Sequence, residues 1–299
     1  MRSVSVARWL ACAALAVSAP LWARGSEDLP LPWNTPADPA ACTDQDSALW
    51  VEYANGQACI RYFSAVPLAH APVVIVMFHG DRNIEMHRAP AAIAGNTLRA
   101  KDRQAAALSR RAGVPVVIVA RPGTYGSSGN HGQRRQPAEF QALDAALDQL
   151  RQRYGIGRFV LLGHSGGATV VAALLTLGRN DVQCAVMTSG AFALLERAQM
   201  IRRSKGLPSR EGRDTNGLLH PYDPLEHVAG IAQVADRRLF VVGNRDDQVA
   251  PFVLQAQFYQ ALRDAGLQAQ LIEAPAIAPA FHQLRNDIGL KTAAQCAQP

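Results

Sequence analysis

The stretch that decides the fold is residues 158–177, which read RFVLLGHSGGATVVAALLTL. The run RFVLL is apolar enough for a buried β-strand, and the stretch 168–177 favours a helix. Between them lies the pattern G-x-S-x-G, which in a strand–turn–helix context places a serine on a very sharp turn. Gly163 and Gly167 leave room for this turn, because larger side chains there would collide. The sequence therefore predicts that the hydroxyl of Ser165 is lifted clear of the sheet as a nucleophile.

Length and composition are those of an ordinary globular protein. The chain has 299 residues, of which 48% are hydrophobic and 18% are charged. A chain of this length can bury a full hydrophobic core, and this composition is not typical of a disordered protein. The formal charge of +6 is spread out, with arginine pairs at 134–135, 202–203 and 237–238. Because no aromatic residues or nucleic-acid-binding motif accompany these pairs, we expect solvated arginines and no nucleic-acid partner.

The first 23 residues have the pattern of a secretory signal peptide. Arg2 and Arg8 form a basic start, an apolar stretch follows at 10–21, and Ala23 or Gly25 offers a small residue for cleavage. The apolar stretch is short for a membrane span, although an uncleaved anchor is the alternative. We expect an exported protein, periplasmic or secreted, without a stable membrane span once the signal is removed.

Four cysteines lie beyond the expected signal peptide, namely Cys42, Cys59, Cys184 and Cys296. An even number in an exported chain indicates disulfides, and four cysteines allow three pairings. Cys42 and Cys59 flank a short N-terminal hairpin, whereas Cys184 and Cys296 belong to a strand and a last helix that meet at one edge of the expected sheet. We predict Cys42–Cys59 and Cys184–Cys296, with four buried free thiols as the alternative.

Strands and helices alternate along most of the chain. Residues 24–47 form a Pro- and Ala-rich extension, and Asn55-Gly56 predicts a hairpin between strands at 49–54 and 57–63. Continuous apolar runs predict strands covered on both faces at 73–78, 114–120, 159–162, 182–188, 239–242 and 268–273. Helices are expected at 96–111, 137–153, 168–177 and 251–265. This alternation predicts one domain over 48–299 with a parallel α/β sheet and right-handed crossovers.

The strand pattern lapses over residues 190–236, which contain polar and Gly-rich stretches. An insertion at this point, after the sixth strand, would lie above the strand ends as a small cap or lid. Its basic segment 202–213 would attract anionic substrates, with an ordinary solvated loop as the alternative.

A serine nucleophile needs a base to take its proton and an acid to orient that base. Where the serine follows a central strand, the acid and the histidine come later in the chain. Only His282 remains after the last expected strand, so we expect it to be the base. His220 and His227, in the expected cap, are the alternatives.

The acid is expected in the loop after the strand at 239–242, which reads GNRDDQV over residues 243–249. Asp246 is the first choice, Asp247 the second and Asp223 a distant third. One of the two adjacent aspartates would then be solvated or would cap the following helix.

A second loop is expected beside the serine. It follows the strand at 73–78 and begins with His79, Gly80 and Asp81. The backbone N–H groups of Asp81 and Gly166 would form an oxyanion hole, and loss of one such donor costs about a hundredfold in rate.

A further strand end carries the glycine-rich stretch 121–129, which reads RPGTYGSSG. Tyr125 in this stretch and His79 in the neighbouring loop are candidate substrate contacts. An ordinary glycine-rich turn is the alternative for the stretch.

In this order, the motifs resemble those of the α/β-hydrolase superfamily over roughly residues 50–296. The resemblance implies an eight-stranded, mostly parallel sheet flanked by helices, a cap after the sixth strand, and a Ser-His-Asp triad without metal or cofactor. Members cleave esters, thioesters, amides and peptides. Dehalogenase and epoxide hydrolase relatives carry an aspartate where this chain has Ser165. The chain also lacks the HGGG run of lipases similar to hormone-sensitive lipase, and it has no room for the β-propeller of acyl-peptidases.

These features predict an exported serine hydrolase that cleaves small carboxylic esters through an acyl-enzyme intermediate. A small exported peptidase or amidase with the same triad is the alternative. A non-catalytic binding protein that kept the fold is a third possibility, and labelling of Ser165 by a fluorophosphonate would exclude it.

Overall fold

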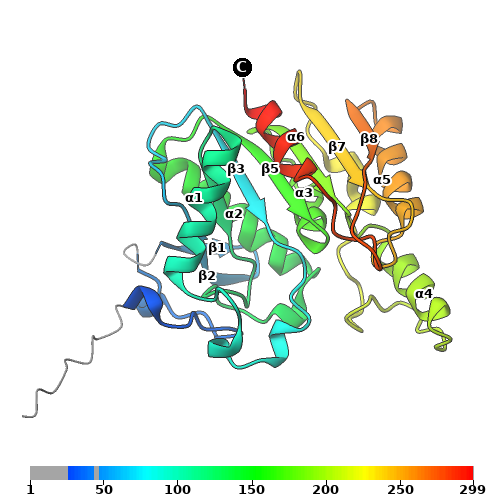
Figure 1. Ribbon diagram of the computed structural model, residues 1–299, viewed down its shortest axis with the longest axis horizontal. Coiled ribbons are helices and arrows are strands. Elements are labelled where there is room, and N and C mark those ends of the chain that lie inside the picture. The colour runs from blue at the N-terminus through cyan, green and yellow to red at the C-terminus, as the bar shows by residue number, and fades with distance from the viewer. Residues whose placement is uncertain (1–25, 44–46, 299) are drawn as a thin grey trace, which may run out of the picture.

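The computed structural model describes residues 26–43 and 47–298, and these form one sheet with helices on both faces (Figure 1). The expected signal peptide, residues 1–23, lies outside the described residues. The strands are β1 (Ala48–Tyr53), β2 (Gly56–Phe63), β3 (Val73–Phe78), β4 (Val116–Val119), β5 (Arg158–His164), β6 (Val182–Thr188), β7 (Arg238–Gly243) and β8 (Ala269–Glu273). The α-helices are α1 (Leu98–Ala112), α2 (Pro137–Tyr154), α3 (Gly166–Thr176), α4 (Leu194–Ser204), α5 (Phe252–Asp264) and α6 (Ile288–Ala297). Short 3-10 helices are η1 (Ser26–Asp28), η2 (Pro39–Ala41), η4 (Glu85–His87), η5 (Pro90–Ala92), η6 (His131–Gln133) and η7 (Pro224–Gly230).

The eight strands lie in the order β1-β2-β4-β3-β5-β6-β7-β8. β2 runs antiparallel to both β1 and β4, whereas all other neighbours are parallel. The parallel strands therefore end at one common edge, where the loops after β3, β4, β5, β6 and β7 meet. The predicted mostly parallel, eight-stranded sheet is confirmed.

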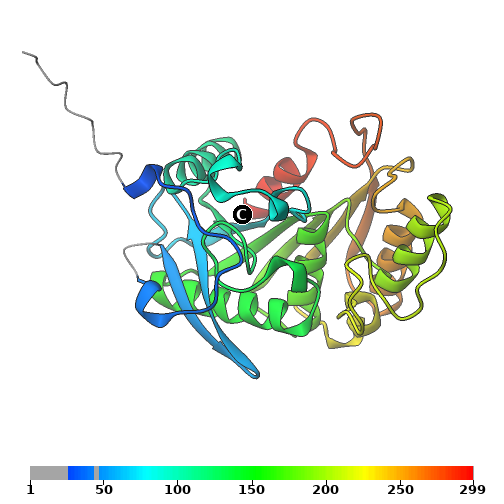
Figure 2. The ribbon, with the colours of Figure 1, turned by 90° about the horizontal axis from the view of Figure 1, so that it is seen from below.

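Both faces of the sheet are buried, as the continuous apolar strands predicted. In β3, Val76 packs in the cluster that contains side chains of α2, α3 and α5, while Ile75 packs with α6 on the opposite face. Figure 2 shows α1 and α6 on one side of the sheet and α2 and α3 on the other. Helix ends follow the sequence, since α2 begins with Pro137 and ends before Gly155 at a φ of 62°.

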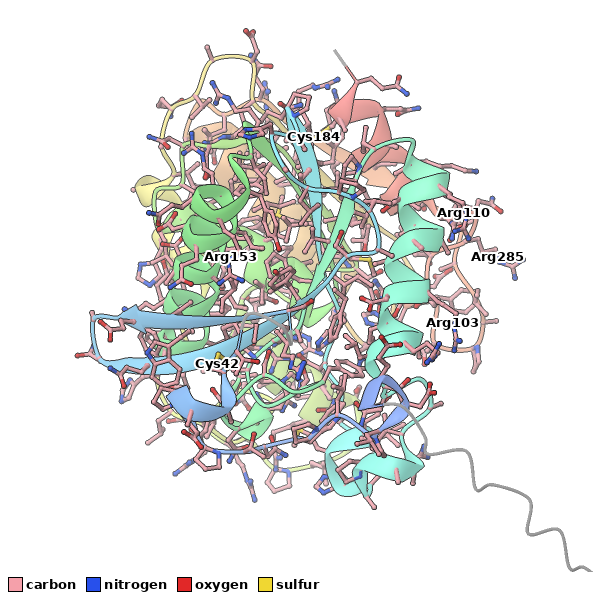
Figure 3. All side chains as sticks on the ribbon, turned by 90° about the vertical axis from the view of Figure 1, so that its left-hand side faces the viewer. Cys42, Arg103, Arg110, Arg153, Cys184 and Arg285 are labelled. Carbon is pink, nitrogen blue, oxygen red and sulfur yellow. A yellow bond between two sulfur atoms is a disulfide. The ribbon has the colours of Figure 1, made fainter. Side chains whose placement is uncertain are left out.

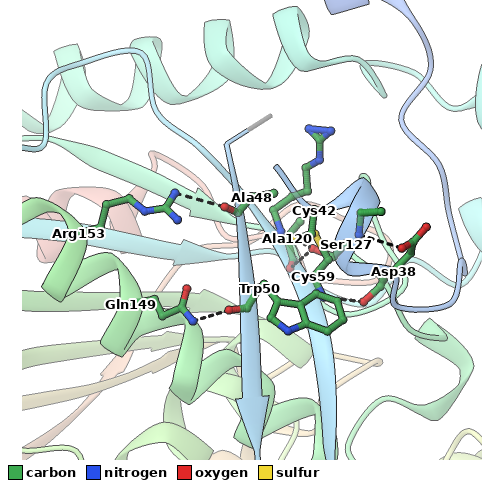
Figure 4. Close-up of a disulfide and its surroundings, with 12 residues drawn as sticks. Asp38, Cys42, Ala48, Trp50, Cys59, Ala120, Ser127, Gln149 and Arg153 are labelled. Carbon is green, nitrogen blue, oxygen red and sulfur yellow. Dashed lines mark hydrogen bonds between the residues drawn. A yellow bond between two sulfur atoms is a disulfide. The ribbon is translucent and has the colours of Figure 1, made fainter. Parts of the chain in front are cut away.

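The disulfides join Cys42 to Cys59 and Cys184 to Cys296, which is the predicted pairing. They lie in different parts of the molecule (Figure 3). The first attaches the N-terminal extension to β2, beside β1 at the edge of the sheet (Figure 4). The second joins β6 to α6, so that it fastens a central strand to the last helix.

Residues 190–236 contain α4, a long loop and η7, with one isolated bridge between Arg213 and Leu219. In both ribbon views α4 projects from the sheet beyond β7 and β8 (Figures 1 and 2). Its place after β6 is the one expected for an insertion, and its action as a lid stays a prediction. In the described parts of the chain, no helix combines the length and the apolar character that crossing a membrane requires.

Candidate active site

Ser165 occupies a strained turn between β5 and α3. Its φ of 55° and ψ of −121° lie in a region that non-glycine residues rarely adopt. A Cβ on Gly163 would collide with the backbone of Gly167, and a Cβ on Gly167 would collide with the carbonyl of Phe78. The Ser165 N–H donates to the Thr188 carbonyl at 2.8 Å, which fixes the turn against β6. Both glycines are therefore required by contact with other backbone, as the sequence pattern predicted.

His282 lies in the loop between β8 and α6 and contacts a buried carboxylate. Its Nδ1 is 2.9 Å and 3.0 Å from the two carboxylate oxygens of Asp247. The Asp247 side chain is fully buried and also accepts the N–H groups of Val249 and Ala250, each at 2.8 Å. Because Nδ1–H donates to this carboxylate, the other ring nitrogen, Nε2, is left to accept a proton.

The structure corrects the choice between the two adjacent aspartates. Asp246, the first choice from the sequence, is exposed, and its backbone N–H donates to the side chain of Asn244. The Asp247 N–H donates to the Asn244 carbonyl at 3.1 Å, so the chain turns here and carries only the second aspartate into the interior. Spacing along the sequence could not separate two neighbours in one loop.

The alternative residues have other partners. Asp223 caps η7 by accepting the N–H of Leu225, and burial raises the pKa of its carboxyl group. His227 stacks on the ring of Tyr222 at 4.2 Å between centroids, and His220 is exposed. Neither histidine contacts Asp247 within the described residues.

The His282 loop lies beside the serine turn. The rings of His282 and His164 are 4.9 Å apart, and the Ser189 hydroxyl donates to the His282 carbonyl at 2.8 Å. Burial and the neighbouring His282 lower the pKa of His164 to about 4, so His164 is neutral at neutral pH. No hydrogen bond within the described residues joins Ser165 Oγ to His282, and such bonds often form only in the substrate complex.

The loop after β3 packs directly against the serine. A Cβ on Gly80 would lie 3.2 Å from the Cβ of Ser165, and a Cβ on Gly166 would collide with the Asp81 carboxylate. Gly80 therefore lies close to Ser165, and the Asp81 side chain lies against Gly166. An oxyanion hole formed by the N–H groups of Asp81 and Gly166 stays a prediction.

Three arginines surround the Asp81 carboxylate, which would otherwise repel negative charge at the predicted oxyanion hole. Arg121 Nη1 is 2.9 Å and Arg134 Nε is 3.3 Å from its oxygens, and Arg135 Nη2 also donates to it. Burial by itself raises the pKa of Asp81, but the three guanidinium groups outweigh this effect and hold the pKa well below its usual range. Asp81 is therefore ionised and locally neutralised.

This ion cluster extends to the candidate acid. Glu139 accepts Arg121 Nε at 2.7 Å, and Arg135 Nη1 reaches Thr215 of the insertion at 3.2 Å. Arg197, from α4, donates to the same Thr215 hydroxyl and to the Val249 carbonyl. A continuous set of polar contacts, mostly buried but passing through the exposed Thr215, therefore joins the loop after β3 to the loop that carries Asp247.

Sequence reasoning missed this cluster. The expectation of solvated arginine pairs was wrong for Arg134, Arg135 and Arg237, whose exposed fractions are 7%, 1% and 3%. Arg237 donates to three backbone carbonyls, those of Arg179, Val182 and Ala232. Arg121 is fully buried two residues after the end of β4, and a charged residue so close to the end of a central strand is the signal that would have indicated the cluster.

Tyr125 and His79 do not face an open cavity. The Tyr125 ring packs on Trp33 and His79, at 4.9 Å and 5.2 Å between centroids. His79 Nε2 lies 3.0 Å from the Thr124 hydroxyl, and burial lowers the pKa of His79 well below its ordinary value. Both side chains hold neighbouring loops together, which does not support the predicted substrate contacts.

Two cavities flank the candidate triad. One of about 470 Å³ lies between α4 and the loop of Asp247, with Met200, Ile201 and Lys205 in its wall. A smaller one of about 140 Å³ is lined by His164 and Thr188, among others. Within the described residues, no group of three or more His, Cys, Asp or Glu side chains is placed to hold a metal ion.

Comparisons with known proteins agree with the observed topology. A family model described as alpha/beta hydrolase fold matches residues 94–213. An esterase from Pyrococcus furiosus is similar in structure with a TM-score of 0.53 and 14% identity, over 89% of this chain and 97% of that one. A thermostable carboxylesterase cloned from a metagenomic library has a TM-score of 0.55 and 15% identity, over 84% and 89% of the two chains. No curated protein matches the sequence.

A puromycin-hydrolyzing peptidase from Mycobacterium tuberculosis is also similar, with a TM-score of 0.53 and 17% identity over 84% of this chain. This chain spans only 39% of that peptidase. At such identities the likeness concerns the fold. The strand order, the family model and these structures together show that this chain has the α/β-hydrolase fold.

Proposed function

We propose that this protein is a serine hydrolase that cleaves small carboxylic esters. The observation that carries the proposal is the meeting of three elements at one edge of the sheet. Ser165 stands on the turn after β5, His282 lies beside that turn, and the fully buried Asp247 holds the histidine Nδ1. Nucleophile, base and orienting acid are the parts that acyl transfer through a serine needs.

In the proposed reaction, Ser165 Oγ attacks the ester carbonyl carbon while His282 Nε2 takes the hydroxyl proton. The N–H groups of Gly166 and Asp81 would bind the oxyanion of the tetrahedral intermediate. When the C–O bond breaks, His282 returns the proton to the leaving alcohol. Water then attacks the acyl-enzyme with His282 as base, and the acid product and free Ser165 are released.

An ester substrate is favoured over a peptide by the extent of the structural likeness. This chain corresponds to 97% and 89% of two esterases, whereas it spans 39% of the peptidase. A small exported peptidase or amidase with the same triad is the alternative, and the acyl-transfer chemistry would be the same.

We further propose that the protein acts outside the cytoplasm. The two disulfides support this proposal, because disulfides persist mainly in oxidising compartments. Together with the signal-peptide pattern of residues 1–23, they point to a periplasmic or secreted enzyme.

The test is hydrolysis of short p-nitrophenyl esters by the wild type and by Ser165→Ala, with Ser209→Ala, at an exposed serine, as the matched surface control. We expect Ser165→Ala to lose activity by about 10³-fold or more and to lose labelling by a fluorophosphonate, while Ser209→Ala keeps both. Full activity of Ser165→Ala would refute the proposal. Aminoacyl p-nitroanilides measured in parallel separate the two substrate classes, since an amidase would prefer them to the esters.

A further inference from the structure

A cavity of about 570 Å³ lies at the same edge of the sheet as Ser165 but away from it. Its wall comes from the β1–β2 hairpin, the loop after β4 and the first turns of α2. β3 separates β4 from β5, so two strand spacings, about 10 Å, divide this cavity from the serine. The proposed acyl-transfer reaction does not account for it.

The charged side chains in the wall already have partners inside the protein. They are Glu139 and Arg134. Glu139 accepts Arg121 Nε at 2.7 Å and the Arg135 N–H at 2.6 Å. Arg134 donates to the His131 carbonyl at 3.0 Å and faces Asp81 at 3.3 Å. A charged ligand would therefore find no free counter-ion here.

Uncharged amides supply most of the other polar groups. They come from Asn55, Gln57, Asn130, Gln133, Gln136 and Gln141. The Oε1 atom of Gln141 is buried and has no hydrogen-bond partner among the described residues. An amide presents a donor and an acceptor side by side. This pair matches two neighbouring hydroxyl groups, each of which can donate and accept.

Apolar surface lies between these amides. The half-buried Tyr53 contributes a ring, and Ala58, Pro122 and Ala142 contribute aliphatic groups. A ligand that fits this wall has hydroxyl groups on its edge and C–H groups on its faces. Sugars in their ring form have both features and no charge.

We propose that this cavity is a binding site for an uncharged mono- or disaccharide. Its volume lies within the range of about 300–1,000 Å³ that is usual for small-molecule sites. Gln57, Asn130 and Gln136 each use one amide atom within the protein. The remaining amide atoms bind the hydroxyl groups, with Gln141 Oε1 accepting one of them, and the Tyr53 ring packs against a sugar face. Binding at this site needs neither Ser165 nor His282, so it is independent of the proposed hydrolase activity.

The experiment is calorimetric titration of the full-length protein carrying Ser165→Ala with cellobiose, xylobiose and maltose. We expect at least one of these sugars to bind. Gln141→Leu should weaken that binding by about tenfold, because a buried hydrogen bond is lost. Ala138→Trp, at an exposed residue in the cavity wall, should abolish it by filling the space. Gln260→Leu, on the exposed surface of α5, is the matched control and should bind as before.

Three results would overturn the proposal. They are absence of binding by all three sugars, binding that survives both Gln141→Leu and Ala138→Trp, and tighter binding of a tripeptide or a uronic acid than of any neutral sugar. If Gln141→Leu does not fold, Ala138→Trp alone decides, because its side chain lies at the surface. Loss of ester hydrolysis in Ser165→Ala is a separate observation, so either proposal can fail without the other.

Discussion

At the scale of single residues, Asp246 and Asp247 show how the same side chain in adjacent positions can have opposite roles. Asp246 is exposed, whereas Asp247 is fully buried and bound by His282 and two backbone N–H groups. A buried carboxylate with this set of donors keeps the imidazole in one orientation and stabilises its protonated form during acyl transfer.

We expect Asp247→Asn to lower kcat/KM for p-nitrophenyl acetate by about 10³- to 10⁴-fold, because the amide no longer compensates the imidazolium charge. Asp246→Asn is the matched control and should stay within about twofold of the wild type, since its side chain is solvated. Thermal unfolding of both variants shows whether the fold is kept. A larger loss in Asp246→Asn than in Asp247→Asn would mean that the acid has been assigned to the wrong residue.

Lys101 is a second residue whose environment sets its chemistry. It is 8% exposed, and its ammonium lies 3.5 Å from the centroid of the Tyr125 ring. Burial, with a smaller contribution from Arg82, lowers the pKa of Lys101 to about 7, while Glu85 opposes the change. The ordinary value in an unfolded chain is about 10.4.

The unfolded state therefore binds more protons than the folded state between pH 7 and 10, so Lys101 makes the free energy of unfolding rise with pH in this window. We expect Lys101→Met to be stabilising at pH 6. This advantage should shrink by up to about 1.4 kcal/mol per pH unit from pH 7 to 9, as the wild-type lysine loses its proton. Urea unfolding of both proteins at four pH values measures the difference. A difference that does not change with pH would show that Lys101 keeps its proton in the fold.

At the scale of elements, the edge strand β1 depends on α2 and on the neighbouring disulfide. Gln149 donates to the Trp50 carbonyl, and Arg153 donates to the Ala48 carbonyl at 3.3 Å (Figure 4). Side chains of a helix thus satisfy acceptors that the edge strand would otherwise leave to solvent. The Cys42–Cys59 bond fastens the extension to β2 beside it.

The two disulfides should contribute unequally to stability. Cys184–Cys296 closes a sequence separation of 112 residues and Cys42–Cys59 one of 17. If a disulfide stabilises by lowering the entropy of the unfolded chain, closing these two loops adds about 5 and 3 kcal/mol, respectively, to the free energy of unfolding. We expect the double variant Cys184→Ala, Cys296→Ala to lose more free energy of unfolding in urea than Cys42→Ala, Cys59→Ala. Equal losses would show that loop closure in the unfolded state does not set the difference.

At the scale of the whole molecule, buried charges connect parts that are far apart in the chain. Arg197 of α4 bonds to Val249, two residues from Asp247, and shares Thr215 with Arg135. Arg135 in turn binds Asp81 in the loop beside Ser165. The insertion is therefore tied to both sides of the candidate active site.

We expect Arg197→Met to lower kcat by about tenfold or more, equivalent to about 1.4 kcal/mol in the activation barrier, because the loop of Asp247 loses its two bonds to α4. KM should change less, since this guanidinium is buried and donates to protein groups, the Val249 carbonyl and the Thr215 hydroxyl. Arg203→Met, at an exposed position on the same helix, is the control and should leave both constants unchanged. A change in KM alone would indicate that Arg197 acts on substrate binding and not on the acid loop.

The sequence by itself determined the features that depend on near neighbours. The apolar runs predicted the strands, the glycines around Ser165 predicted the turn, and the order of motifs predicted the sheet with His282 late in the chain. These patterns follow from local sterics and from the need to bury both faces of the sheet. Both constraints act on the residues of a single segment, so they can be read from that segment alone.

Only the tertiary structure decided which charged groups are buried and which groups they contact. Asp247 was separated from Asp246 by the turn at Asn244, and the Arg134–Arg135 pair became interior because Asp81, some fifty residues earlier, lies against it. The cavity beside α2 likewise needs three segments from distant parts of the chain. A charge is buried only where partners from elsewhere compensate the cost of desolvation, and no stretch of sequence shows those partners by itself.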